Sequence, residues 1–274
     1  MGYMCKYVHY ILILFYNIRT LMYKKSNYLL KIIICIFLFL IFYIFLLNFN
    51  ENFTGKNNEI EIVVSRYNES MDWLNNYPFN KYDITIYNKG LNYGFPKNEK
   101  IKRILNINNL GRESHTYLYH IIQNYDVLAN VTVFLPGSCE REDKYYSALN
   151  TIHKVEETKN TVFNSITNDV YTDFKDFLID EYQSTSNENK SINDENKLKL
   201  SQYRPFGEWF KHYFGDINVK NISYFGIFAV HKNHILQHPK SYYENLIKEL
   251  EESSNPEAGH FFERAWGAVF YPTE

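Results

Sequence analysis

The sequence predicts an α/β fold for residues 59–274, because strand and helix patterns alternate along its first half. Two apolar runs rich in β-branched residues, Glu61–Ser65 (EIVVS) and Val131–Leu135 (VTVFL), are typical of buried strands. Between them lie an alternating segment at Asp83–Tyr87 (DITIY) and a helical apolar period from Gly111 to about Tyr125. With a short helix before the second strand, the order is that of a mostly parallel sheet flanked by helices.

The second half of the chain is less regular. We expect one or two helices over residues 144–166 and another over residues 170–182. Residues 183–197 are polar and lack an apolar period, which predicts a flexible loop. Residues 224–230 (YFGIFAV) have the composition of a strand. Three further helices are predicted, at His231–Gln237, Ser241–Glu252 and Gly259–Phe270.

An apolar run near the N-terminus, Leu29–Leu47, predicts one transmembrane helix. A bilayer core about 30 Å thick needs roughly 20 apolar residues, and the only charged residue in the run, Lys31, lies near one end. Asn48 and its neighbours do not form a small-residue cleavage site, so a cleaved signal peptide is not expected. The predicted organisation is an N-terminal segment at 1–28, an anchor at 29–48, a stem at 49–58 and one domain at 59–274.

The charges beside the anchor predict its orientation. Arg19 and Lys24 precede the apolar run, and the first basic residue after it is Lys56. The positive-inside rule therefore places the N-terminus in the cytosol and the domain in a lumen or outside the cell, as a single-pass membrane protein. In such a compartment we expect the glycosylation sequons at Asn52 and Asn189 to be used.

Composition limits the partners. The sequence has 29 Lys and Arg against 31 Asp and Glu, a net charge of -2, which does not indicate a nucleic-acid partner. Cys139 is the only cysteine after the anchor, so the domain has no internal disulfide and no zinc-type cysteine cluster. We expect Cys139 to be a buried free thiol.

Polar residues cluster after the predicted strands, where ligands bind in open α/β sheets. Each cluster alone is typical of a surface turn, but their shared position at one edge of the sheet favours a binding site. The candidate residues are Arg66, Asn68 and Glu69 after the first strand, Asn88, Lys89 and Gly90 after the second, and Glu140, Glu142 and Asp143 after the third.

The densest polar run, GRESHT, begins at Gly111. A helix that starts here offers free backbone N–H groups and a dipole that favours an anion, and Arg112 can grip a phosphate or carboxylate. An ordinary helix start with Glu113 complementing the dipole is the alternative. We favour binding because His115 lies one turn before Tyr119, on a face that is otherwise expected to be apolar.

A second run near the C-terminus, GHFFERAW, begins at Gly259. On a helix His260 and Glu263 share a face, and Arg264 follows His260 by four residues. A glutamate beside an arginine among aromatic residues can act as a general base or a metal ligand. A buried Glu–Arg pair that anchors the last helix is an equally good interpretation.

Several segments together resemble a protein family. They are VVSRYNES, IYNKG, NLGRESHTYLYHII, VTVFLPGS, FGIFAVHKNHILQHPKSYYENL and GHFFERAW. The sequence is similar to an uncharacterised, glycosyltransferase-like family of the domain-of-unknown-function type, over nearly all of Glu59–Tyr271. The most specific motifs are GRE-x-H-T-Y-L and the C-terminal ER-x-W.

The order of elements also resembles the GT-A glycosyltransferase fold, a Rossmann-like mixed sheet flanked by helices. This resemblance implies a nucleotide-sugar donor and a divalent metal, Mn or Mg. Such enzymes usually carry Asp-x-Asp after the strand that ends at Leu135, where this chain has Pro136-Gly137-Ser138. Two interpretations remain open here. Either the metal is bound within the acidic group Glu140, Glu142 and Asp143, or no metal is used.

The same resemblance implies roles for the C-terminal run. Glu263 would be the base that deprotonates an acceptor hydroxyl, and His260 would contact the metal or a phosphate. Arg264 is the third expected catalytic residue, and Trp266 is expected beside the substrate. Because the roles come from likeness of fold, they are expectations about the site and not yet about activity.

We therefore expect a membrane-anchored glycosyltransferase-like protein that transfers a sugar from a nucleotide-sugar to a glycan or protein acceptor. The missing Asp-x-Asp motivates an alternative, a non-catalytic carbohydrate-binding or scaffolding protein on a degenerate transferase fold. A hydrolase is the weakest hypothesis, because the sequence does not place the carboxylate pair that hydrolysis would need.

Overall fold

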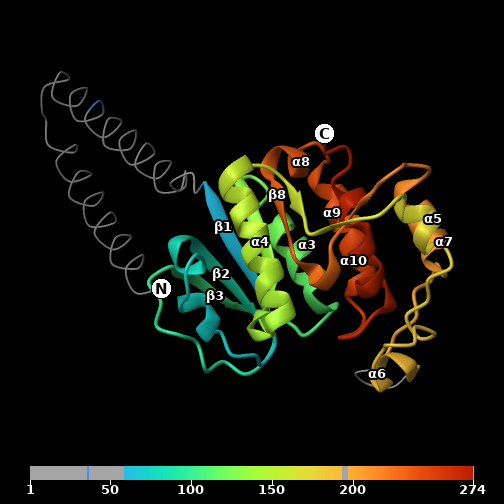
Figure 1. The fold of residues 1–274 in the computed structure, drawn as a ribbon, viewed down its shortest axis with the longest axis horizontal. Coiled ribbons are helices and arrows are strands. Elements are labelled where there is room, and N and C mark those ends of the chain that lie inside the picture. The colour runs from blue at the N-terminus through green and yellow to red at the C-terminus, as the bar shows by residue number, and fades with distance from the viewer. Residues whose placement is uncertain (1–35, 37–58, 193–196, 274) are drawn as a thin grey trace, which may run out of the picture. The chain divides into compact units, whose positions relative to one another are not determined.

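The computed structural model describes residues 36, 59–192 and 197–273, and Figure 1 shows their fold. The predicted N-terminal segment, stem and all but one residue of the anchor lie outside the described residues. Among the residues that are described, no helix is long and apolar enough to cross a membrane. The account that follows concerns residues 59–273, which lie in one compact unit.

A six-stranded mixed sheet forms the centre of this unit, in the order β3-β2-β1-β4-β8-β5. Its strands are β1 (Ile60–Arg66), β2 (Asp83–Asn88), β3 (Ile101–Asn106), β4 (Val131–Pro136), β5 (Val162–Phe163) and β8 (Phe228–His231). The first four are parallel to one another, and β8 is antiparallel to both β4 and β5. The predicted α/β fold with a mixed sheet flanked by helices is therefore confirmed.

Both faces of the sheet are covered, as the apolar runs in the sequence require. Successive residues of a strand point to opposite faces, so Val63 belongs to one apolar cluster while Ile62 and Val64 belong to the other. The helices α3 (Arg112–Asn124) and α10 (Glu257–Val269) cover the Val63 face. On the other face α4 (Glu142–Thr158) runs along the sheet and is seen in front of it in Figure 1.

Shorter elements connect these layers. The 3-10 helices are η1 (Asp72–Asn75), η2 (Phe79–Lys81), η3 (Gly137–Glu140), η4 (Tyr224–Gly226) and η5 (Ile247–Leu250). The remaining α-helices are α5 (Val170–Phe174), α6 (Asn187–Lys190), α7 (Phe206–Phe214), α8 (Lys232–Leu236) and α9 (Lys240–Leu246). A small antiparallel pair is formed by β6 (Ser165–Ile166) and β7 (Asn221–Ile222).

Several sequence-based expectations for the second half were wrong. The helix expected to reach residue 166 ends at Thr158, and β5 and β6 follow, because Lys159 adopts a left-handed conformation that closes the last turn. The helix expected over 170–182 ends at Phe174. The strand expected from Tyr224 begins only at Phe228, after the 3-10 turn η4.

Strand β3 was not predicted. Apart from Ile101 its residues are exposed, and Lys102 and Arg103 interrupt the apolar residues, so the segment has no alternating pattern. It is an edge strand held by parallel backbone pairing to β2, and charged residues on such an edge hinder pairing with other chains. Part of the stretch predicted as a flexible loop at 183–197 forms the short helix α6.

Candidate functional site

A polar cleft of about 630 Å³ lies at the carboxyl ends of β1, β2 and β4. Its position matches the rule for open α/β sheets, because β1 lies between β2 and β4 and the chain changes direction across it. The cleft collects side chains from seven separate parts of the sequence. Its ionisable lining residues are Arg66, Tyr67, Glu69, Lys89, Arg112, Glu113, Arg141, Lys144, Glu188, His260 and Glu263.

Arg66 at the end of β1 holds the floor of the cleft together. It is only 3% exposed, and its guanidinium donates to Asn88 Oδ1 at 2.6 Å and to the backbone oxygens of Glu69, Leu91 and Tyr93 at 2.9–3.0 Å. Because most of its donors are already used within the protein, Arg66 positions the turns after β1 and β2.

Three other predicted residues near Arg66 also bond to or pack against the backbone of the turns after β1 and β2. Asn68 Oδ1 accepts the Leu91 N–H at 2.9 Å. A Cβ on Gly90 would lie 1.7 Å from the Tyr67 carbonyl oxygen, so the two turns approach closely only because residue 90 is glycine. Asn68, Asn88 and Gly90 therefore shape the cleft without lining it.

Lys89 reaches across the cleft toward the start of α3. Its Nζ donates to the carbonyl oxygens of Leu110 and Arg112. Burial lowers the Lys89 pKa to about 7, so a good part of this residue is neutral at pH 7. An anionic ligand in the cleft would restore its positive charge.

A hydrogen-bonded group joins α3, α6 and α10 along one wall. Asn255 Oδ1 accepts from Arg112 Nη1 at 3.1 Å and lies 3.4 Å from His260 Nε2, while Asn255 Nδ2 donates to Asn189 Oδ1 at 2.8 Å. Burial, together with the charges of Arg112 and Arg264, lowers the His260 pKa well below its ordinary value, so its imidazole is neutral.

The Asn189 side chain is thus buried, and its Oδ1 accepts a hydrogen bond from Asn255 Nδ2. Asn189 also belongs to the wall of the cleft, where a glycan would have to displace its neighbours. The burial of Asn189 therefore argues against use of this sequon once the domain has folded.

Glu263 closes the opposite side of the cleft. Its Oε1 accepts the backbone N–H of Phe225, a residue held at a positive φ of 65° in η4. Burial raises the Glu263 pKa above its ordinary value, and this effect exceeds the opposing attraction of the Arg264 charge. Positive φ at a bulky residue is rare and clusters at functional sites.

Cationic side chains gather beyond the end of β4. Lys144 Nζ donates to Ser138 Oγ at 2.7 Å and lies 5.6 Å above the Phe225 ring. Both Lys144 and Ser138 line the cleft, as does Arg141.

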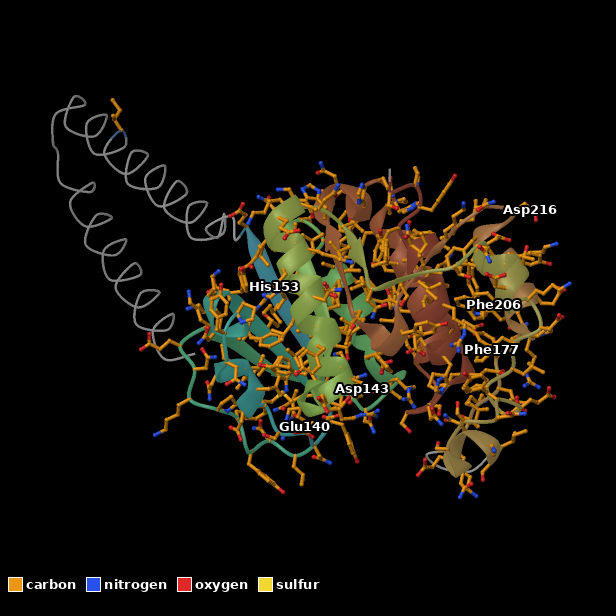
Figure 2. All side chains as sticks on the ribbon, viewed as in Figure 1. Glu140, Asp143, His153, Phe177, Phe206 and Asp216 are labelled. Carbon is orange, nitrogen blue, oxygen red and sulfur yellow. The ribbon has the colours of Figure 1, made fainter. Side chains whose placement is uncertain are left out.

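The carboxylates predicted as metal ligands do not join them. Glu140, Glu142 and Asp143 are exposed and do not line the cleft, and Asp143 pairs with Arg141 at 2.9 Å. Figure 2 labels Glu140 and Asp143 where the chain enters α4. In the described residues no three His, Cys, Asp or Glu side chains are close enough to hold a metal ion. These carboxylates therefore do not fit a metal site in the cleft.

Four other predicted residues lie elsewhere. Gly111 is buried against Leu250 and its N–H donates to the Ser253 carbonyl, so this group is not free for an anion. His115 is buried beside Tyr119, and burial lowers its pKa to about 4. Trp266 belongs to the apolar core between α10 and the sheet, and Arg264 lines a different pocket.

Sequence reasoning missed Lys144, Asn255 and Phe225. Lys144 lies on the first turn of α4, eight residues after the end of β4. No sequence motif marks a basic residue at that distance from a strand. Asn255 precedes the last helix in a Ser-Ser-Asn-Pro run typical of an ordinary turn. The sequence predicts a strand over residues 224–230, which does not single out Phe225 as a residue of a binding site.

The fold and the cleft define an α/β protein with a polar cleft of mixed charge at the switch point of its sheet. Over residues 62–274 the chain matches a family described as "Protein of unknown function (DUF3431)", and it belongs to that family. The predicted likeness to an uncharacterised family is thereby confirmed, whereas no glycosyltransferase family matches. Searches of curated proteins and of solved structures found no match.

Proposed function

We propose that this protein is a membrane-anchored glycosyltransferase that transfers a sugar from a nucleotide-sugar to a glycan or protein acceptor. The observation that carries the proposal is the cleft itself. It gathers the cations Arg112, Arg141 and Lys144 and a half-buried carboxylate of raised pKa, Glu263, at the carboxyl ends of parallel strands.

The sheet supports the same class of enzyme. Three parallel strands in the order β3-β2-β1, followed by parallel β4 and antiparallel β8, agree with the Rossmann-like mixed sheet of GT-A enzymes. Fold likeness raises the expectation of a nucleotide donor but does not identify an activity, so the argument for chemistry depends on the cleft.

The positively charged side chains of the cleft are suited to bind the diphosphate of a nucleotide-sugar donor. Arg112 can bind phosphate oxygens with two parallel hydrogen bonds, and Lys144 supplies a compact charge beside Ser138. In transfer these groups would stabilise the nucleoside diphosphate as it leaves with the electrons of its bond to the sugar anomeric carbon.

Glu263 is suited to activate the hydroxyl group of the acceptor. Its carboxylate would take the proton of an acceptor hydroxyl while the hydroxyl oxygen forms the new bond to the anomeric carbon. A raised pKa makes the carboxylate a stronger base, nearer to the working pH that general base catalysis favours. A divalent metal remains a prediction, and no step above depends on it.

The Lys144–Ser138 pair also favours a second candidate, a non-catalytic nucleotide- or carbohydrate-binding protein. A cation at the position where metal-dependent transferases place their carboxylates would hold a phosphorylated ligand without turning it over. This candidate predicts binding without transfer.

The test uses the full chain purified in detergent and a panel of nucleotide-sugars, each with Mn²⁺ and with a chelator. We expect at least one donor to bind and to release its nucleotide when an acceptor is added. Lys144→Met should weaken donor binding about tenfold or more, because a hydrogen bond to a charged group contributes about 1.5–3 kcal/mol.

Lys154→Met is the matched control, since Lys154 is exposed on the same helix α4 and should leave donor binding unchanged. Binding of no donor under either metal condition would contradict the transferase. Binding without nucleotide release in the parent protein would instead support the non-catalytic candidate.

A further inference from the structure

Lys144 presents a positively charged group to the cleft. It is half-buried on the first turn of α4 and lines the cleft, so a ligand there can reach its ammonium group. Its Nζ donates to Ser138 Oγ at 2.7 Å, which uses one of the three N–H groups of the ammonium and leaves two for a ligand. The contact with Ser138 fixes the side chain at the end of β4.

Lys144 and Glu263 contact the same residue of the η4 turn. Lys144 Nζ lies 5.6 Å from the ring centroid of Phe225, and Glu263 Oε1 accepts the backbone N–H of Phe225. The cation and the proposed base are therefore neighbours across one residue, and both line the same cleft. This arrangement suits a donor whose diphosphate contacts Lys144 while its anomeric carbon lies toward Glu263.

Two arginines extend the positive charge. Arg141 lines the cleft three residues before Lys144, and its side chain is 61% exposed. Its Nη2 pairs with Asp143 at 2.9 Å, but a surface ion pair of this kind contributes little to stability, so exchanging it for a phosphate costs little. Arg112 also lines the cleft and donates to Asn255 through Nη1, which leaves further N–H groups of its guanidinium for a ligand.

The carboxylates of the cleft do not form a metal site beside these cations. Within the part of the chain that the structure describes, four acidic residues line the cleft, each from a different segment: Glu69, Glu113, Glu188 and Glu263. No three His, Cys, Asp or Glu side chains of the described residues are close enough together to hold a metal ion. Glu69 Oε2 already accepts the Tyr67 N–H at 2.6 Å. A divalent ion beside Lys144 would also be repelled by the ammonium charge.

We propose that the protein binds the diphosphate of its donor without a divalent metal, with Lys144 and Arg141 supplying the charge that a metal would supply. The inference rests on the proposed transferase function and replaces the metal that the resemblance to GT-A enzymes predicts. When the bond between the anomeric carbon and the diphosphate oxygen breaks, its electrons remain on the diphosphate, and the two cations stabilise that charge. Neither cation gives up a proton, because the proton of the acceptor hydroxyl goes to Glu263.

The first test uses a diphosphate without a nucleoside. The full chain in detergent is titrated calorimetrically with inorganic pyrophosphate, once in excess EDTA and once in excess Mn²⁺. We expect pyrophosphate to bind in EDTA and the added Mn²⁺ not to tighten the binding, because the ion and Lys144 compete for the same oxygens. Binding that requires Mn²⁺, or no binding under either condition, would overturn the proposal.

Variants then locate the diphosphate. In EDTA, Lys144→Met should weaken pyrophosphate binding about tenfold or more, because it removes a hydrogen bond from a charged group. Lys144→Arg, which keeps the charge, should retain most of the affinity. The matched control is Lys154→Met, at an exposed position of the same helix, which should bind as the parent does.

Thermal denaturation identifies the variants that remain folded. A folded Lys144→Met protein with the affinity of the parent would contradict the assignment. Arg141→Gln provides a second variant, since its exposed side chain can be changed without disturbing the core, and it should also weaken binding in EDTA. Unchanged affinity in this variant would remove Arg141 from the proposed site.

The two proposals fail in different ways. If pyrophosphate binds in EDTA through Lys144 but no nucleotide-sugar binds, the transferase is contradicted and the cleft is a metal-free site for diphosphates alone. If a nucleotide-sugar binds and is turned over only with Mn²⁺, the transferase stands and this inference is wrong.

Discussion

As the proposed base, Glu263 would serve catalysis at a cost in stability. Its carboxylate is half-buried, and loss of hydration disfavours the charged form, so the pKa of Glu263 in the folded protein lies above the ordinary value of 4.5. By proton linkage, the stability contributed by this residue is fully present below about pH 4.5 and is lost as pH rises through the raised pKa.

Glu263→Gln should therefore separate activity from stability. The amide can still accept the Phe225 N–H but cannot take a proton, so we expect the transfer rate to fall about 100- to 10,000-fold. In the parent protein the rate should rise with pH through the raised Glu263 pKa, and the variant should lack this rise. Steady-state rates across pH at saturating donor measure both effects.

The same variant tests whether Glu263 is instead a structural partner of Arg264. If burial disfavours the charged form of Glu263, the free energy of unfolding should fall less between acid and neutral pH in Glu263→Gln than in the parent protein. A variant that unfolds more easily than the parent at neutral pH, by thermal denaturation, would favour the structural ion pair.

At the scale of elements, α10 is the helix that positions the site. Its aromatic residues pack on α7 and on the sheet, and its residues 260, 263 and 264 line two separate cavities. The helix also approaches β7 closely at Gly267, where a Cβ would lie 2.3 Å from the Asn221 carbonyl oxygen. Only glycine permits this approach.

We predict that Gly267→Ala destabilises the fold by about 1–3 kcal/mol, the cost of overpacking a buried site. Gly259→Ala on the same helix is the matched control. Its Cβ would meet only ordinary contacts, the nearest at 3.4 Å from Arg112 Cδ, so the higher helix propensity of alanine should leave the fold as stable or up to about 1 kcal/mol more stable. Equal melting temperatures for the two variants would contradict the close approach.

At the scale of the whole molecule, the proposed membrane anchor would determine the compartment in which the domain lies. The apolar run Leu29–Leu47 and the basic residues before it favour a domain on the non-cytosolic side. That orientation suits a transferase acting on glycans or proteins of the secretory route.

We expect the full chain made in sealed microsomes to stay in the membrane on carbonate extraction and its domain to be protected from added protease. Removing residues 29–47 should release the chain from the membrane. If the domain is lumenal, Asn52→Gln should remove a glycan, whereas Asn189→Gln should not change the mass, because the Asn189 amide is buried. Digestion of the domain in intact microsomes would reverse the orientation.

Much of the fold could be predicted because hydrophobic periodicity is a local property. The strands β1, β2 and β4 and the helices α3 and α10 all lie where their apolar patterns placed them. Strand β3 has little local signal, since exposed and charged residues form most of it and its pairing to β2 holds it in place. The antiparallel direction of β8 was likewise set by contacts with β4 and β5.

By itself, the sequence determined the fold class, the family and the polar clusters at the strand ends, because composition and spacing carry these signals. Only the tertiary structure decided which polar residues face a common cavity. In the folded protein Arg66 holds two turns together, Lys144 lines the cleft, and the neighbouring residues Glu263 and Arg264 line different cavities. The physical reason is that side-chain direction and burial depend on neighbours distant in the chain, which no local pattern encodes.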